Sequence, residues 1–268
     1  MQVSFWSNFH QLGTTHNMIA IAVLTALEYR MRILMAHNHF DKSALEYAFI
    51  DRKNIYHELT DLSDTGIDAL SRVIKFNKLE KNDISSYTTT ILKNRLDLLC
   101  GTRNTNKELY LNNLKSVIQM ILQSAVKYYE LVFVDTASGN NDISCIIIEK
   151  SDLVIVNLNQ NVLVLEDFVN CFGDIKDKAM IILSRYDKDS RYNLKAIKRR
   201  FGFVNIHVIP YNIGFADACS ESGAIDFFLK NLNAEKDDYN YYFIKAVREA
   251  AEAILTQLGI DTEQKKAN

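Results

Sequence analysis

Short apolar runs alternate with longer segments of helical period along almost the whole chain. Runs of four or five mostly apolar residues predict strands. They are Val3–Trp6, Arg32–Ala36, Leu96–Cys100, Leu131–Asp135, Leu153–Val156, Ala179–Leu183 and Ile206–Ile209. Polar and apolar residues do not alternate within these runs, which is typical of strands buried on both faces of a parallel sheet.

Between these runs lie segments with the apolar spacing of helices. They are Thr15–Arg30, Ser43–Phe49, Ile67–Phe76, Asn106–Tyr128, Asn140–Glu149, Val162–Phe172, Tyr192–Phe201, Phe215–Leu229 and Tyr239–Leu258. The last of them is amphipathic, as expected for a helix packed on the outside of a domain. Alternating strands and helices predict an α/β fold with a doubly wound, mostly parallel sheet and helices on both faces.

The segment 50–95 is polar and helical in character and contains no convincing strand. The whole chain has one proline and nine glycines, which leaves little material for a flexible linker. We therefore expect residues 1–261 to form a single domain. The polar end of the chain, 262–268, is expected to be a frayed, disordered tail.

The composition is ordinary for a globular protein, with 48% hydrophobic and 24% charged residues. A net charge of −2 gives no general electrostatic reason to expect nucleic acid as a partner. No C-x-x-C pair is present, so the cysteines are interpreted as buried apolar residues in a reducing compartment. These are Cys100, Cys145, Cys171 and Cys219. The apolar run Met18–Leu27 is too short to span a bilayer and no signal-peptide pattern occurs, which favours a cytoplasmic protein.

The loop after the first strand matches part of a phosphate-binding pattern. Residues 8–15 align with G-x-x-x-x-G-K-[ST], and Gly13 and Thr15 supply the second glycine and the hydroxyl. Asn8 stands at the first glycine, and Thr14 stands at the lysine. Taken alone, these residues are explained more simply if Thr15 caps the following helix.

A second candidate lies at the end of the strand Leu131–Asp135, before the turn Thr136–Gly139. An acid at the carboxyl end of a buried strand can hold magnesium directly or through water. The alternative is that Asp135 only caps the loop to the next helix.

The order of these pieces resembles the MinD/ParA family of deviant P-loop ATPases over nearly the whole chain. The matching segments are Val3–His16, Ile33–Ser43, Phe133–Gly139, Ser151–Val156, Leu183–Asp187, Ile209–Asn212 and Phe243–Leu255. The resemblance implies ATP or ADP as a ligand, with magnesium at Thr15 and Asp135, and a homodimer across the phosphate-loop face. It also implies a nucleotide site made of His10, Gln11, Leu12, Gly13, Thr14, Thr15, His16, Ser184, Arg185, Pro210, Tyr211 and Asn212.

An aromatic first strand followed by Gly-Thr-Thr most resembles the divergent TadZ and CpaE branch of that family. This placement implies a protein partner in the localisation of pilus or secretion machinery. The final helix mixes Lys245 and Arg248 with Glu249 and Glu252, unlike a membrane-targeting helix.

Several family positions are changed. Phe9 and Thr14 stand where the family has two loop lysines. The family's D-x-D motif aligns with residues 37–39, which are His-Asn-His. Asp41, two residues further on, is a possible substitute for the missing acids. Each lost charge donor costs about 2.7–4 kcal/mol of transition-state stabilisation, or roughly 100- to 1000-fold in rate. Hydrolysis is therefore expected to be lost, whereas backbone amides at a helix N-terminus still bind phosphate.

These observations favour a nucleotide-binding scaffold, or pseudo-ATPase, that positions partner machinery. The alternatives are a slow Mg-ATPase using Thr15, Asp135 and His10, or a DNA-partitioning factor with a basic helix over 191–200. Four histidines, His10, His16, His37 and His39, are expected near Asp135. Their spacing matches no local zinc pattern, so polar filling of the pocket is favoured over a metal site. The aromatic cluster over 239–243 is expected to pack on the sheet; a partner anchor is the alternative.

Overall fold

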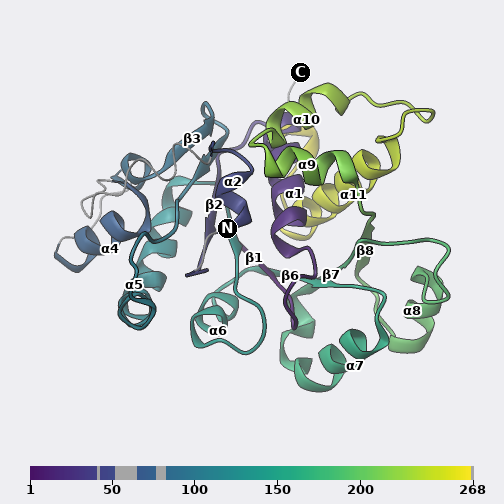
Figure 1. Cartoon of the computed structure of the whole chain (residues 1–268), viewed down its shortest axis with the longest axis horizontal. Helices are drawn as coiled ribbons and strands as arrows, with labels where there is room; N and C mark the ends of the chain where they lie inside the picture. The colour runs from purple at the N-terminus through teal and green to yellow at the C-terminus, as the bar shows by residue number, and fades with distance from the viewer. Residues whose placement is uncertain (41–42, 52–64, 77–82, 267–268) are drawn as a thin grey trace.

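The computed structural model describes residues 1–40, 43–51, 65–76 and 83–266. These residues form an eight-stranded sheet of order β3-β4-β2-β5-β1-β6-β7-β8 (Figure 1). The strands are β1 (Gln2–Trp6), β2 (Ile33–His37), β3 (Thr89–Leu92), β4 (Leu96–Leu98), β5 (Leu131–Asp135), β6 (Leu153–Leu158), β7 (Ala179–Ser184) and β8 (Ile206–Ile209). All neighbouring pairs are parallel except β3 and β4.

All the predicted strands are present, with ends within two residues of those expected. The sequence pattern missed β3, which lies within the segment 50–95. β3 is an edge strand, and its residues are half-buried or exposed, so it has no continuous apolar run. Its antiparallel register with β4 also shifts between Thr90 and Leu92. Asp41 and much of the polar segment 50–95 lie outside the described residues.

Helices cover both faces of the sheet, as predicted (Figure 1). They are α1 (Thr14–Glu28), α2 (Ala44–Tyr47), α4 (Gly66–Phe76), α5 (Lys107–Tyr128), α6 (Asp142–Glu149), α7 (Val162–Cys171), α8 (Leu194–Phe201), α9 (Ile213–Ser220), α10 (Ala224–Asn231), α11 (Tyr241–Gln257) and α12 (Thr262–Lys265). Buried residues of α1, α2 and α9–α11 pack on one face, and those of α4–α8 pack on the other. Alternate residues of each strand supply the two cores.

The helix predicted over Phe215–Leu229 is in fact two helices, α9 and α10. Ser222 has φ 60°, a left-handed conformation that ends the first helix before Gly223. Apolar spacing continues across this break, which is why the sequence pattern does not show it. Within the described residues, no helix has the combination of length and apolar character that crossing a bilayer requires.

Residues 262–265 form the short helix α12, which Asp261 caps by accepting hydrogen bonds from two backbone amides, and Lys265 forms an ion pair with Glu130. The expectation for the cysteines is wrong. The cysteines are not all buried: Cys145 and Cys171 are exposed, on α6 and at the end of α7. Burial does raise the pKa of the Cys219 thiol, to about 12.

Candidate functional site

The loop 7–13 joins β1 to α1 at the carboxyl edge of the sheet. Gly13 is the N-cap of α1 and has φ 85°, a left-handed conformation that favours glycine. No side chain caps this helix, and its first turn contains no acidic residue. Thr15 therefore is not the helix cap that the simpler interpretation requires. The first amides of a 15-residue helix remain available to an anion.

Side chains of the loop are held by the protein. Asn8 Nδ2 donates to the Val164 carbonyl at 2.9 Å and to Asp167 Oδ2 at 2.8 Å, which ties the loop to α7. Thr14, at the lysine position of the pattern, is buried and donates from Oγ1 to Ser7 Oγ at 3.1 Å. The Thr14 side chain is thus a neutral group that faces the loop itself.

The loop is also tied to the segment that follows β5. Trp6, the last residue of β1, donates from Nε1 to the Gly139 carbonyl at 3.1 Å. The Gly139 amide donates to the Ser7 carbonyl at 2.9 Å. His10 is exposed, and its Nδ1 lies 2.6 Å from Ser138 Oγ. These hydrogen bonds join the two loops to each other.

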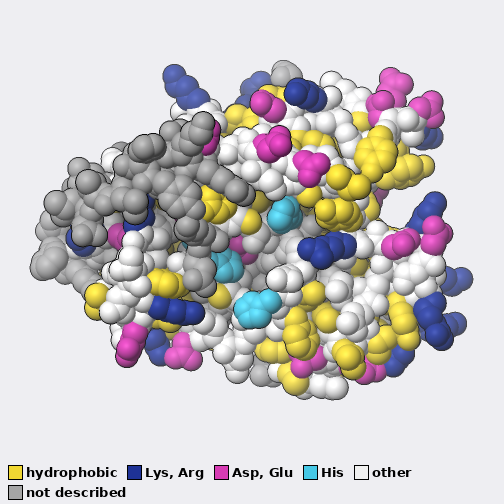
Figure 2. Space-filling model, in the orientation of Figure 1, with side chains coloured by type: hydrophobic (Ala, Val, Ile, Leu, Met, Phe, Trp, Pro, Cys, Tyr) yellow, Lys and Arg dark blue, Asp and Glu magenta, His cyan; other side chains and the backbone are white. Residues whose placement is uncertain are grey.

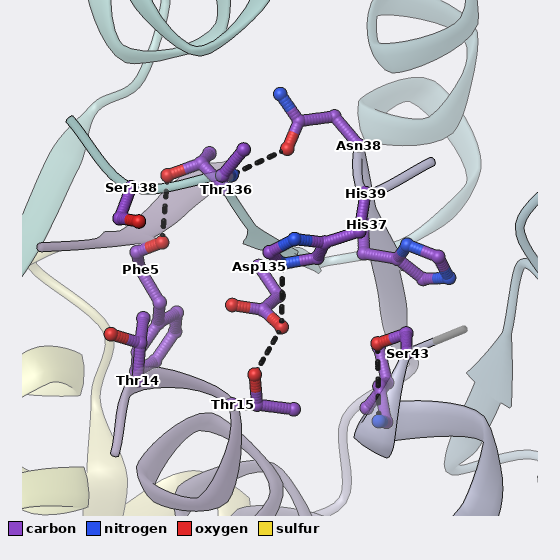
Figure 3. A network of polar contacts seen from close by, with 12 residues as sticks. Phe5, Thr14, Thr15, His37, Asn38, His39, Ser43, Asp135, Thr136 and Ser138 are labelled. Atoms are coloured by element: carbon purple, nitrogen blue, oxygen red, sulfur yellow. Dashed lines mark hydrogen bonds and ion pairs between the residues drawn. The ribbon is translucent and has the colours of Figure 1, made fainter. Parts of the chain in front are cut away.

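Asp135 is fully buried, with 0% exposure, at the end of β5. Its Oδ2 accepts a hydrogen bond from Thr15 Oγ1 at 2.7 Å and lies 3.2 Å from His39 Nε2 (Figure 3). Its Oδ1 has no hydrogen-bond partner. The next helix, α6, is capped by Asn141, so Asp135 is not a helix cap. Thr15 and Asp135 thus lie together, with a histidine beside them.

A hollow of about 130 Å³ lies beside the start of α1. Its lining includes these residues of the predicted nucleotide site: Gly13, His16, Ser184, Arg185, Pro210, Tyr211 and Asn212. The other predicted residues, His10, Gln11, Leu12, Thr14 and Thr15, lie on the loop and the first turn of α1, which meet the hollow at Gly13. Segments from four parts of the chain therefore converge on one surface.

Known structures share this arrangement over nearly their whole length. A ParA family ATPase from Chlorobium tepidum superposes with a TM-score of 0.73 at 14% identity, covering 94% of this chain and 98% of that one. MinD from Pyrococcus horikoshii, complexed with Mg-ADP, gives 0.70 at 15% identity, covering 96% and 97%. A chain of the MinC:MinD cell division protein complex from Aquifex aeolicus gives a TM-score of 0.66 at 13% identity, covering 95% of this chain and 96% of that one. The chain has the MinD/ParA fold. Neither a family sequence model nor a curated protein sequence matches it.

The hollow of this MinD/ParA fold is also lined by Asn17, a polar residue that the sequence prediction missed. Asn17 Nδ2, on α1, donates to Asn157 Oδ1 and to Ser184 Oγ, each at 2.8 Å. The one available signal was an asparagine, Asn157, within an apolar strand. Asn212 caps α9 by accepting from the Phe215 amide at 2.8 Å. These bonds fix the wall of the hollow before any ligand enters.

Two further groups in the hollow remain available to a ligand. Burial and the nearby positive charge of Arg185 lower the pKa of His16 below its ordinary 6.5, against the opposite effect of Asp135. The imidazole of His16 is therefore neutral at pH 7. Arg185 has φ 51°, and its guanidinium forms no ion pair or hydrogen bond with any described residue. The hollow thus combines one unpaired cation with a neutral ring.

Residues 37 and 38, at the end of β2, make structural contacts. His37 is 3% exposed, and its Nε2 lies 3.1 Å from Glu46 Oε1, which also accepts from the Gly101 amide at 2.6 Å. Burial raises the pKa of Glu46, but the His37 hydrogen bond and charge, with the Gly101 amide, outweigh it, so the pKa lies below its ordinary value. Asn38 accepts from the Ala137 amide at 2.6 Å. These side chains hold the end of β2 in place.

Figure 2 shows histidine side chains gathered at the middle of one face of the molecule. They nevertheless have separate partners: Ser138 for His10, Glu46 for His37 and Asp135 for His39, while His16 lines the hollow. In the described part of the chain, no three His, Cys, Asp or Glu side chains are grouped so as to hold a metal ion. Polar filling of the pocket remains the interpretation for these histidines.

The Thr15 hydroxyl and the Asp135 carboxylate are oxygen groups of the kind that hold a magnesium ion beside the phosphates of a nucleotide. Mg²⁺ requires six oxygen ligands in an octahedron and keeps several of its waters. This site offers the Thr15 hydroxyl and one carboxylate, Asp135, which is closed to solvent and already lies against Thr15 and His39. Glu46 and Asp167, which are acids nearby, are hydrogen-bonded to His37 and Asn8.

Two surface features complete the site's surroundings. On the basic helix α8, Arg200 pairs with Glu166 at 2.6 Å. In the aromatic cluster, Phe243 is buried as expected, whereas Tyr239 and Tyr242 are 79% and 70% exposed. The expectation that the whole cluster packs on the sheet is therefore wrong for these two tyrosines, because they lie at the outer side of the start of α11.

Proposed function

We propose that this chain is a MinD/ParA-type protein that binds a nucleotide, hydrolyses it negligibly, and serves as a scaffold for a protein partner. One observation supports this most directly. Thr14 occupies the lysine position and is buried against Ser7, while Thr15 and Asp135 keep the contact expected of a nucleotide site. The binding architecture is retained, and the charge that would assist phosphoryl transfer is missing.

Nucleotide binding is supported by the start of α1 and by the hollow. The uncapped amides of α1 suit a phosphate group, because they carry the positive end of the helix dipole. The hollow, which meets the loop at Gly13, suits a base: Phe215 and Phe243 provide apolar surface, and Arg185 is unpaired. MinD from Pyrococcus horikoshii, which shares the fold, is complexed with Mg-ADP.

Loss of hydrolysis is supported by the charges at the loop. Residues 7–15 include no lysine or arginine. Removing a preorganised charge donor typically slows a reaction roughly 100- to 1000-fold. His10, the substitute cation of the slow-ATPase alternative, is exposed and bound to Ser138. The scaffold is therefore favoured over the slow Mg-ATPase.

A scaffold requires surfaces for partners. Phe9 is 44% exposed on the loop, and we propose that it lies in a homodimer interface across this face. Tyr239 and Tyr242 give a second exposed aromatic surface, suited to a protein partner. The aromatic end of β1 resembles the TadZ and CpaE branch, and pilus or secretion machinery is the partner class that we propose on that basis.

The test combines binding with turnover. Thermal unfolding is measured with and without millimolar ATP or ADP, because a ligand at 100 times its Kd stabilises the folded state by about 2.7 kcal/mol. Arg185→Ala should abolish the shift, and Arg191→Ala is the matched control on another surface loop. A flat result for the wild type would reject nucleotide binding. Phosphate release that Asp135→Asn abolishes would reject the scaffold and favour the slow ATPase.

A further inference from the structure

We propose that an exposed aromatic surface at the edge of the hollow docks a basic, amphipathic segment of a protein partner; this rests on the scaffold role proposed above. The surface consists of Tyr211, Ile213, Tyr239 and Tyr242, which are 60%, 55%, 79% and 70% exposed. We call it the tyrosine surface. Tyr211 also lines the hollow, so the tyrosine surface begins where the hollow opens.

Hydrogen bonds between asparagine side chains bring these residues together from separate parts of the chain. Asn212 Nδ2 donates to Asn240 Oδ1 at 2.8 Å, and Asn240 Nδ2 donates to Asn231 Oδ1 at 2.8 Å. The loop after β8, the end of α10 and the start of α11 are therefore tied to one another. Each of the four exposed residues lies within two positions of Asn212 or Asn240 along the chain, so they form one surface.

A packed aromatic core supports the tyrosine surface from beneath. The centroid of the Phe215 ring lies 5.4 Å from that of Phe227, 5.5 Å from that of Phe228 and 5.1 Å from that of Phe243. All four of these phenylalanines are buried. The backbone that carries the exposed side chains is thus fixed by packing as well as by hydrogen bonds. A surface that is ordered before binding loses less conformational entropy when a partner docks.

The chain around the tyrosine surface is acidic. Residues 211–242 include six acidic and two basic residues, a net charge of −4, whereas the whole chain has a net charge of −2. All six acidic residues are exposed, and none forms an ion pair with any residue that the structure describes. They are Asp217, Glu221, Asp226, Glu235, Asp237 and Asp238. Figure 2 shows hydrophobic and acidic side chains together over the part of the molecule where Figure 1 places α9 and α10.

This charge decides which occupant fits the tyrosine surface. A second copy docked through the same surface would bring two negative regions together, and nucleic acid or an anionic membrane would be repelled in the same way. A polypeptide segment with Lys or Arg beside apolar residues is attracted instead. Its cations meet the unpaired carboxylates and stack on tyrosine rings, while its apolar side chains cover the aromatic surface. An amphipathic helix presents these two kinds of side chain on adjacent faces.

Selection of random peptides displayed on phage tests the inference, with nucleotide-free protein as the target. The enriched peptides are expected to combine Lys or Arg with aromatic or aliphatic residues and to bind more weakly as salt is added. The tyrosine variant, Tyr239→Ala with Tyr242→Ala, should bind them roughly tenfold more weakly or worse. The matched control is Val204→Ala, which shortens an 89%-exposed apolar side chain before β8, at the opposite edge of the sheet.

Charge reversal gives a second readout. Asp217→Lys with Asp237→Lys should weaken binding of the same peptides and reduce its dependence on salt. Asp177→Lys reverses an exposed charge before β7 and should leave binding as in the wild type. All the replaced side chains are exposed, so urea midpoints should stay at the wild-type value and show that each variant is folded.

Three results would overturn the inference: enriched peptides that are acidic or neutral, peptides that bind the tyrosine variant as tightly as the wild type, or no enrichment. A wild-type dimer that the tyrosine variant cannot form would assign the surface to a second copy, and binding of anionic vesicles that this variant loses would assign it to a membrane; either also overturns the inference. All these results leave the proposed nucleotide binding intact. A flat thermal shift with ATP would reject nucleotide binding and leave the tyrosine surface unaffected.

Discussion

The bare α-carbon of Gly101 leaves room for the His37 ring, and filling that room with a methyl group should destabilise the protein. A Cβ at position 101 would lie 2.3 Å from His37 Cε1, 2.6 Å from His37 Nε2 and 3.2 Å from Glu46 Oε1. The first two distances are shorter than real Cβ contacts, so the ring must move. His37 is buried, so the ring cannot move without disturbing its packing and its bond to Glu46.

Two costs add to give the expected magnitude. Forcing an extra methyl into a packed site costs about 1–3 kcal/mol. Weakening a hydrogen bond to a charged group, here the one between His37 and Glu46, costs about 1.5–3 kcal/mol when it is lost and less when it is only stretched. Gly101→Ala is therefore expected to lower the free energy of unfolding by roughly 2–5 kcal/mol.

Urea denaturation with linear extrapolation measures this change. Gly173→Ala is the matched control, because nothing lies within 4 Å of a Cβ there; it should be neutral or stabilising by up to about 1 kcal/mol. In a His37→Ala background the cost of Gly101→Ala should fall by about 1–3 kcal/mol, since the clashing ring is gone. If Gly101→Ala proves as stable as Gly173→Ala, the packing of His37 described above is wrong.

Three further outcomes are expected. The pKa of Glu46 is below its ordinary 4.5 because the hydrogen bond and charge of His37 help to outweigh the effect of burial. Glu46 therefore contributes stability above about pH 4.5, and this stability is lost as the pH falls through its folded pKa. Glu46→Gln should reduce this loss in acid, as measured by urea midpoints from pH 3 to 7. Arg248→Ala removes guanidinium bonds of 2.6 and 2.8 Å to Glu28 and should cost about 1–3 kcal/mol by the same denaturation, with no loss if the pair contributes nothing. Cys219, with a pKa of about 12, should resist a thiol reagent at pH 8 until unfolding, while the exposed cysteines react; early labelling would contradict its burial.

The sequence was sufficient to predict the central sheet, because strands buried on both faces must be apolar throughout. β5 shows this well, since all five of its residues are buried and its predicted ends are those observed. β3 could not be found in the same way. Thr89 and Thr90 lie on an edge strand, where half of the surface faces solvent and no burial requirement shapes the sequence. The junction between the loop and α1 was likewise predictable, because Gly13 and Thr15 keep a recognisable spacing.

The partners of the site's side chains were not predictable. The sequence His-Asn-His gives no sign that His37 bonds Glu46 while His39 lies against Asp135, because β2 ends at His37 and the next residues leave the strand. The bond from Asn17 to Asn157 joins residues 140 positions apart. Such pairings depend on how elements meet in three dimensions, and local periodicity carries no information about that.

Trp6 gives the protein a built-in optical probe. It is the only tryptophan in the chain, it is almost completely buried, and its ring lies edge-on to Phe172 at 4.7 Å. Trp6 directly precedes the loop, which begins at Ser7, and its indole nitrogen donates a hydrogen bond to the Gly139 carbonyl. Tryptophan emission therefore comes from a single place, where the loop and the segment after β5 are joined. Fluorescence can follow a loop rearrangement on ligand binding without any added label.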